Sequence, residues 1–259
     1  RAENKMGLGK WSAPSKMVLT ELGRPDETEM PSICGATTHT VTIYFFTPNP
    51  VSYGGASQRF EVRWSGNGVA FDDAPILPFT LEDAVDLGNK YIRYFKDKLT
   101  VKKVKIVQRK DKLNMEKEWE SGFTIANEHM QEIVDKVQED DTHLFIATEV
   151  TGLEPGFEYR FEVRGVNDED VGPWSQASYS HSTHPTVPLA PHAAFIEERT
   201  LTSIKFAWHA PDSRGTAITN YFVNVQHTGK QFKLPRSQQW FECDHLLPGK
   251  SYYIRVMAE

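Results

Sequence analysis

One seven-residue pattern occurs twice in this chain, and it constrains the fold more than any other feature. Its first copy, Leu-Glu-Pro-Gly-Phe-Glu-Tyr, ends at Tyr159, and its second, Leu-Leu-Pro-Gly-Lys-Ser-Tyr, ends at Tyr252. Behind each copy, apolar side chains fall at every second position, which is typical of a half-buried antiparallel strand that follows a tight turn. The sequence therefore predicts two copies of one β-rich unit.

The tyrosine that ends each copy allows a more specific prediction. It leads the strand, so its hydroxyl can turn back onto the backbone upstream, as in the tyrosine corner of immunoglobulin-like sandwiches. In the first unit, alternation along the strand places Arg160 and Glu162 on the outside. We expect the core of this unit to contain Phe45, Trp64, Leu153, Tyr159, Phe161 and Val163.

Other parts of the chain repeat in the same way. Residues 1–12 share with residues 164–175 an Arg at the first position and then, at the same spacing, Asn, Gly and Trp-Ser. Upstream, the alternating residues of 41–45 match those of 204–208, and the alternating residues of 60–64 match those of 221–225. The order of the strand patterns is therefore the same in both units.

On these linked motifs the chain resembles a tandem array of fibronectin type III domains. The resemblance implies a mainly β chain of tandem immunoglobulin-like sandwiches, with Phe45 at the position where the family usually has a core Trp. We expect residues 1–23 to be the C-terminal strand of a preceding domain. Residues 24–185 would form a domain with a helical insertion at about 66–141, and residues 186–259 a domain truncated before its last strand, so the chain would be a segment of a longer array.

The insertion is the main departure from the repeat, because the interval from Phe60 to Leu153 is several times longer than the equivalent interval in the second unit. Residues 80–83, Thr-Leu-Glu-Asp, resemble a capping box that starts a helix. Apolar residues at helical spacing predict amphipathic helices at 80–98 and about 116–139, with a short strand near 101–109 between them. The apolar sides of these helices would pack on each other or on the sandwich, or would dock on a neighbouring protein.

The insertion also contains the densest cluster of basic residues in the chain. These candidate partner-binding residues are Lys102, Lys103, Lys105, Arg109, Lys110 and Lys112. One interpretation is an electrostatic contact with an acidic partner, such as the tails of a cytoskeletal polymer. The other is protection of an exposed edge strand, where lysines prevent pairing with other chains. Aromatic residues do not alternate with these lysines, which argues against binding of single-stranded nucleic acid.

Several other classes of site are disfavoured. We find no catalytic constellation, cofactor motif or metal-ligand cluster, and we interpret His181, His184 and His192 as parts of a solvated linker. The net charge of −6 gives no overall basic surface for nucleic acid. No run approaches the roughly 18 apolar residues of a membrane span. Cys34 and Cys243 lie at non-equivalent positions in different units, so we expect free thiols.

We therefore expect a non-enzymatic structural or scaffold protein that binds other proteins within a large cytoskeletal or axonemal assembly. The free thiols and the absence of an Asn-X-Ser/Thr sequon favour this intracellular setting. One alternative is the extracellular part of an adhesion protein or receptor. Another is a binding appendage of an enzyme whose catalytic domain lies elsewhere.

Overall fold

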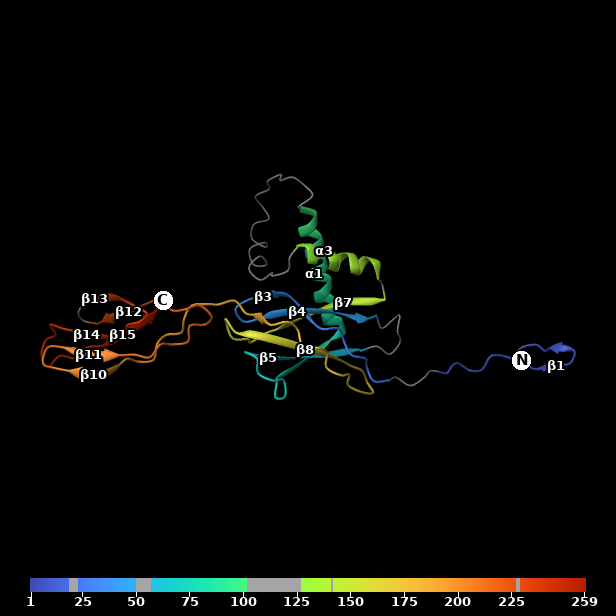
Figure 1. The fold of residues 1–259 in the computed structure, drawn as a ribbon, viewed down its shortest axis with the longest axis horizontal. Coiled ribbons are helices and arrows are strands. Elements are labelled where there is room, and N and C mark those ends of the chain that lie inside the picture. The colour runs from blue at the N-terminus through green and yellow to red at the C-terminus, as the bar shows by residue number, and fades with distance from the viewer. Residues whose placement is uncertain (19–22, 50–56, 102–126, 141, 227–228) are drawn as a thin grey trace.

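A computed structural model describes residues 1–18, 23–49, 57–101, 127–140, 142–226 and 229–259. Within these residues the strands form five sheets, and the two described helices lie against one of them (Figure 1). The mainly β architecture with inserted helices confirms the fold class predicted from the sequence. Every strand pairing between the named strands is antiparallel.

The first sandwich consists of two facing sheets. One sheet has the order β3-β4-β7, made of Ser32–Ala36, Val41–Pro48 and His143–Val150. The other has the order β6-β5-β8-β9, made of Ile76–Thr80, Arg59–Gly66, Glu158–Val166 and His181–Ser182. Side chains at alternate positions of the two sheets meet between them and form one core.

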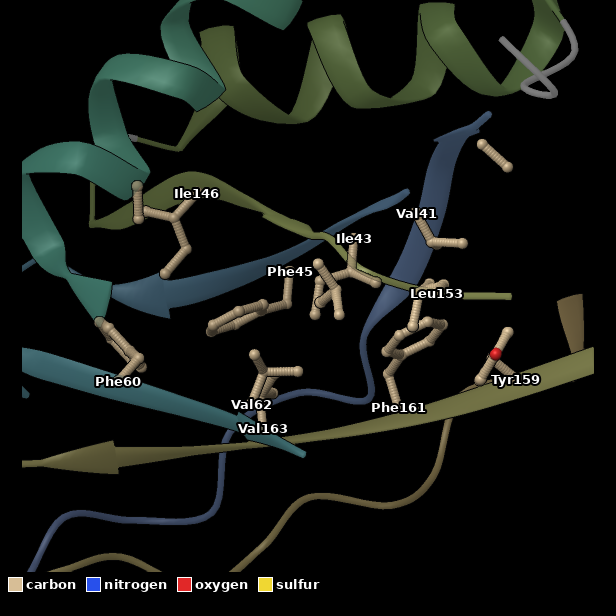
Figure 2. Packing of buried hydrophobic residues seen from close by; sticks show 13 residues of the cluster. Val41, Ile43, Phe45, Phe60, Val62, Ile146, Leu153, Tyr159, Phe161 and Val163 are labelled. Atoms are coloured by element: carbon tan, nitrogen blue, oxygen red, sulfur yellow. The ribbon is translucent and has the colours of Figure 1, made fainter. Parts of the chain in front are cut away.

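Figure 2 shows this core, in which Phe45 and Phe161 are almost completely buried. Leu153, Tyr159 and Val163 are buried with them, and Trp64 is partly buried against the same cluster. The expected register of the core strand is therefore confirmed. Phe45 packs edge-on against Phe60, with ring centroids 5.4 Å apart.

The second sandwich repeats this arrangement. One sheet has the order β10-β11-β14, made of Phe195–Arg199, Ile204–Ala207 and Trp240–Cys243. The other has the order β13-β12-β15, made of Lys230–Pro235, Asn220–Val225 and Ile254–Ala258. Trp208 packs edge-on against Tyr221 at 5.4 Å, as Phe45 does against Phe60 in the first sandwich.

Both tyrosine corners form as the sequence predicts. The Glu154 backbone N–H donates to the Tyr159 hydroxyl oxygen at 2.9 Å, and the Leu247 N–H donates to the Tyr252 hydroxyl oxygen at 2.8 Å. Each hydrogen bond joins the residue directly before the Pro-Gly pair to a tyrosine at or just before the start of the following strand. The repeated heptapeptide therefore encodes one repeated local structure.

The N-terminal residues form a small hairpin of β1, Glu3–Asn4, and β2, Gly7–Leu8. The Gly9 N–H donates to the Ala2 carbonyl at 2.7 Å, as the Gly172 N–H does to the Gly165 carbonyl at 2.8 Å. The partial copy thus shares a backbone contact with the first sandwich as well as a sequence pattern. The expected limits of the three units, at residues 23/24 and 185/186, stay predictions.

The two helices follow β6 and precede β7 in the chain. They are α1, Leu81–Val101, and α3, Asn127–Glu139. Thr80 caps α1, since its hydroxyl oxygen accepts the Asp83 N–H at 3.1 Å and its hydroxyl donates to the Asp83 carboxylate at 2.7 Å. The predicted helix at 80–98 is confirmed. The described part of the predicted 116–139 helix is α3. The predicted strand at 101–109 lies outside the described residues, apart from Val101, which is the last residue of α1.

Candidate interaction surfaces

Both described helices lie over the outer face of the β3-β4-β7 sheet (Figure 1). Their apolar sides pack on this face. The sheet contributes Tyr44, Phe46 and Phe145 to this second core. The helices contribute the buried residues Tyr91, Ile92, Phe95, Met130, Ile133 and Val134. The sequence left open whether the apolar sides of the helices pack within the domain or dock on a neighbouring protein. In the described residues they pack on the sandwich.

Polar contacts add to this apolar packing. The Tyr91 hydroxyl donates to the Thr42 hydroxyl at 3.1 Å, and the Tyr44 hydroxyl hydrogen bonds to the His129 Nε2 at 2.5 Å. Burial raises the pKa of the Tyr44 phenol to about 12 and also raises the pKa of the Tyr91 phenol. Both phenols therefore remain neutral hydrogen-bonding groups at physiological pH.

The sequence placed the start of the insertion at about residue 66, and the structure shows that part of this segment belongs to the sandwich. The strand β6 pairs with β5 over its whole length, from Arg59 opposite Thr80 to Arg63 opposite Ile76. Leu77 and Phe79 of β6 also pack against the first core. The segment that the second sandwich lacks therefore starts after Thr80, where β13 and β14 are joined by a short turn instead.

All six candidate partner-binding residues, Lys102, Lys103, Lys105, Arg109, Lys110 and Lys112, lie outside the described residues. In the sequence they fall between the end of α1 and the start of α3. The second half of α1 leads into them with Lys90, Arg93 and Lys96, which are exposed. The sequence predicted no role for these three residues, although their place on the polar side of the helix could have indicated one. The exposed side of α3 is mainly acidic, with Glu128, Glu132, Asp135 and Glu139.

A second polar surface lies on the outer face of the β6-β5-β8-β9 sheet. The Trp174 ring lies between two guanidinium groups, with the Arg63 Cζ 4.4 Å and the Arg164 Cζ 4.2 Å from its centroid. Arg63 is paired with Glu162 and Arg164 with Glu61, each at 2.5 Å across neighbouring strands. Because each guanidinium is already paired and only partly exposed, we interpret this array as stabilising the sheet.

The two sandwiches contact each other through backbone. Gly156, from the first Pro-Gly turn, lies against Gly215 so closely that a Cβ on either residue would meet the other's backbone. The Thr186 N–H donates to the Arg214 carbonyl at 3.1 Å, and an Arg214 Nη lies 3.3 Å from the His39 Nε2. The Arg-Gly-Thr triplet at 214–216 thus forms part of this junction.

The remaining candidates show no catalytic geometry. Cys34 and Cys243 are buried and neither forms a disulfide, as expected. His181 is partly buried, and burial, with a smaller contribution from the charge of His184, lowers its pKa. In the part of the chain that the structure describes, no group of three His, Cys, Asp or Glu side chains gathers to hold a metal ion. Neither α1 nor α3 is long and apolar enough to cross a membrane.

Comparisons with known proteins agree with this architecture. A family model described as "Fibronectin type III domain" matches residues 189–259. The receptor-type tyrosine-protein phosphatase eta of Gallus gallus is 30% identical over 110 residues, which are 42% of this chain and 8% of that protein. The fibronectin type-III domain-containing protein 3A of Mus musculus is 29% identical over 111 residues, covering 42% and 9%.

Two further proteins complete the comparison. The human protein named Brother of CDO is 25% identical over 129 residues, which are 44% of this chain and 12% of that protein. The crystal structure of the chicken CNTN1 FN1-FN3 domains is 13% identical, with a TM-score of 0.35, covering 98% of this chain and 67% of that one. The chain spans between 8% and 12% of the length of these curated relatives.

The family match covers the second sandwich, and the first sandwich repeats its strand order, its tyrosine corner and its core aromatic pair. The family model therefore identifies residues 189–259 as a fibronectin type III domain. The first sandwich is similar to it and carries a helix between its strands.

Proposed function

We propose that this chain is a non-enzymatic, protein-binding part of a cell-surface receptor or adhesion protein. The names of two relatives, a receptor-type phosphatase and a "cell adhesion molecule-related" protein of Mus musculus that is 26% identical over 129 residues, support this setting. The matched domain type supports the binding role, because fibronectin type III domains are typically non-catalytic modules. We further propose that the basic segment of the insertion contacts the partner.

The proposal that the basic segment contacts the partner rests on how the helices pack on the sandwich. Their described apolar sides are used on the β3-β4-β7 sheet, so the insertion presents charged sides to its surroundings. The exposed Lys90, Arg93 and Lys96 extend the basic character of the 102–112 segment along α1. An acidic partner surface fits this charge. Because single exposed ion pairs contribute under about 1 kcal/mol each, several of them would steer and orient the partner.

Charge reversal tests this proposal more cleanly than deletion of the insertion. Deletion would expose Tyr44, Phe46 and Phe145, so loss of binding could follow from loss of structure. We propose the triple variant Lys102→Glu, Lys103→Glu, Lys105→Glu and fluorescence anisotropy with labelled polyglutamate at low and high salt. The expected result is binding by the parent chain that weakens with salt, and at least about tenfold weaker binding by the variant.

A matched control has the same change in net charge at exposed positions of the N-terminal segment. The variant Lys5→Glu, Lys10→Glu, Lys16→Glu should bind polyglutamate nearly as well as the parent chain. Equal losses in the two variants would mean that only total charge matters. No loss in the first variant would mean that the basic segment does not contact the partner.

A scaffold in a cytoskeletal or axonemal assembly is the second candidate. The specific observation in its favour is that Cys34 and Cys243 are both buried and that neither forms a disulfide, together with the absence of a glycosylation sequon. Surface biotinylation of intact cells that express the full-length protein separates the candidates. Labelling without permeabilisation would support the cell-surface setting, and labelling only after permeabilisation would support the intracellular one. A catalytic domain found elsewhere in the full-length protein would support the remaining alternative, a binding appendage of an enzyme.

A further inference from the structure

The β10-β11-β14 sheet of the second sandwich is equivalent to the β3-β4-β7 sheet of the first. Both described helices pack on the sheet of the first sandwich, and neither packs on the sheet of the second. In the first sandwich, α1 and α3 cover the outer face of β3-β4-β7. The equivalent face of β10-β11-β14 carries Phe195, Ala207 and Trp240 in one row across the three strands. Phe195 is 43% exposed and Trp240 is 47% exposed. Two aromatic residues at half exposure in one row form an apolar area that a partner could bury.

The row has a shape that suits a closely packed partner. Its middle residue, Ala207, occupies the position that Tyr44 has in the first sandwich, since Trp208 corresponds to Phe45. The central strand therefore carries a small side chain in this row, and the two flanking strands carry large ones. In the first sandwich a close approach of this kind occurs where Gly88 brings α1 against the β7 backbone.

The next row of the same face is acidic. Glu198, Lys205 and Glu242 lie opposite one another across the three strands, and Glu197 lies at the bulge beside them. Lys205 is paired with Glu197 at 3.0 Å, and its Nζ lies 5.2 Å from the centroid of the Trp240 ring. Three carboxylates and one ammonium group lie in or beside this row, so together they carry a net negative charge that a cationic partner would complement.

The helices of the first sandwich show what kind of segment covers such a face. The α3 helix is amphipathic, and Met130, Ile133 and Val134 form its buried side. At its margin the Lys136 Nζ lies 3.8 Å from the centroid of the Phe46 ring and 3.4 Å from a Glu29 carboxylate oxygen. An apolar helix side with a lysine over an aromatic ring and beside a carboxylate is thus already used on this type of sheet within the same chain.

We propose that the outer face of β10-β11-β14 is a docking site for an amphipathic helix of a partner protein whose polar margin carries Lys or Arg. The helix buries its apolar side on Phe195 and Trp240 across Ala207. Its basic residues pair with Glu198 and Glu242. This surface is separate from the basic segment of the insertion and takes a partner of opposite charge.

The test uses two designed helical peptides of 18 residues with identical leucine positions. One has lysines at the margin of the leucine side, and the other has glutamates there. Each is titrated into the isotopically labelled chain, and amide chemical shifts are followed by NMR. The expected result is at least about tenfold tighter binding of the lysine peptide, with the largest shifts at Phe195, Ala207, Trp240 and Glu242.

Two variants make the result specific. Trp240→Ser should weaken the lysine peptide at least about tenfold, as expected for removal of a central aromatic contact. Met257→Ser, a 55% exposed residue on the outer face of the other sheet, is the matched control and should have no effect. The double variant Glu198→Lys, Glu242→Lys should reverse the preference and favour the glutamate peptide.

Four results would overturn the proposal: shifts centred on another surface, equal affinity for the two peptides, unchanged binding by Trp240→Ser, or unchanged preference in the double variant. Self-association of the parent chain in sedimentation, lost in Trp240→Ser, would also overturn it, because the face would then bind a second copy. None of these results depends on residues 102–112. The polyglutamate experiment therefore fails or succeeds independently.

Discussion

Gly88 of α1 lies so close to Phe145 of β7 that a Cβ at position 88 would collide with the Phe145 carbonyl oxygen. A glycine inside a helix ordinarily costs about 0.5–1 kcal/mol relative to alanine. Here that cost allows the helix backbone to approach the sheet, so that Tyr91, Ile92 and Phe95 reach the second core. The contact explains why a helix former is absent at the middle of an otherwise regular helix.

Gly88→Ala should therefore destabilise the first sandwich, although helix propensity alone predicts the opposite sign. The expected loss is about 1–3 kcal/mol, the usual cost of forcing an extra methyl group into a packed interface. Hydrogen exchange of the β7 amides under denaturant measures it. Asn89→Ala, at the exposed neighbouring position, should change stability by less than about 0.5 kcal/mol. A stabilised Gly88→Ala variant would show that α1 does not pack on β7 this closely.

The tyrosine corners predict that each sandwich can be destabilised separately. Tyr159→Phe leaves the Glu154 N–H without its acceptor, and Tyr252→Phe does the same to the Leu247 N–H. We expect each change to reduce the free energy of unfolding of its own sandwich by about 1–2 kcal/mol, with the other sandwich unchanged. Tyr179→Phe, at an 82% exposed position, serves as the control. Hydrogen exchange resolves the two sandwiches, and equal losses in both would contradict the assignment of one corner to each.

The Pro-Gly turns provide a matched pair for testing the junction. Gly156 and Gly249 have nearly the same φ, 70° and 72°, so alanine is equally strained at both. Only Gly156 lies against Gly215, and nothing lies within 4 Å of a Cβ at Gly249. Gly156→Ala should therefore change the angle between the sandwiches, which residual dipolar couplings measure, and Gly249→Ala should not. An unchanged angle in both variants would show that the glycine contact does not hold the junction.

Burial also predicts how stability depends on pH. Burial raises the pKa of the Cys34 thiol well above its ordinary value of 9.0, so the folded state keeps the neutral form. The stabilisation is complete below pH 9 and is lost as the pH rises from there towards the folded pKa, because only the unfolded thiol ionises in that range. From this thiol we expect the first sandwich to lose about 1 kcal/mol between pH 9 and 10, with a slope that approaches about 1.4 kcal/mol per pH unit at higher pH.

Cys34→Ala should remove more than half of the slope between pH 9 and 10, because the unfolded thiol, with an ordinary pKa of 9.0, ionises earlier than the phenols of Tyr44 and Tyr91, whose ordinary pKa is 10.0. Chemical denaturation at closely spaced pH values, followed by hydrogen exchange of the β4 amides, measures it. An identical slope in the parent chain and the variant would mean that Cys34 is not buried in the folded state.

The sequence predicted the strands well because the core of a sandwich has a strict two-residue period. The residues Tyr159, Phe161 and Val163 and their partners in the second unit could be assigned to the core from alternation and from the repeated turn alone. The first helix could be predicted as well, because its capping residues and its apolar side are local features. A local pattern carries enough information where neighbouring residues in the chain decide the structure.

The start of the insertion could not be placed in this way. The strand β6 carries a proline at position 78 and lies within the inserted length, so the sequence pattern did not distinguish it from the segment that follows. Its pairing with β5 and its contacts with the first core decide that it belongs to the sandwich. The junction was also missed, because contact between Gly156 and Gly215 leaves no periodic signal in the sequence.

The sequence by itself determined that this chain forms tandem sandwiches with two tyrosine corners and amphipathic helices in the first of them. It could not determine what the helices cover, because an apolar side has the same pattern whether it meets its own domain or a partner. Tertiary structure decided that Tyr44, Phe46 and Phe145 receive the helices and that Phe195 and Trp240, on the equivalent face, remain exposed. The physical reason is that burial depends on which surfaces the whole fold brings together, and the order of residues alone does not specify this.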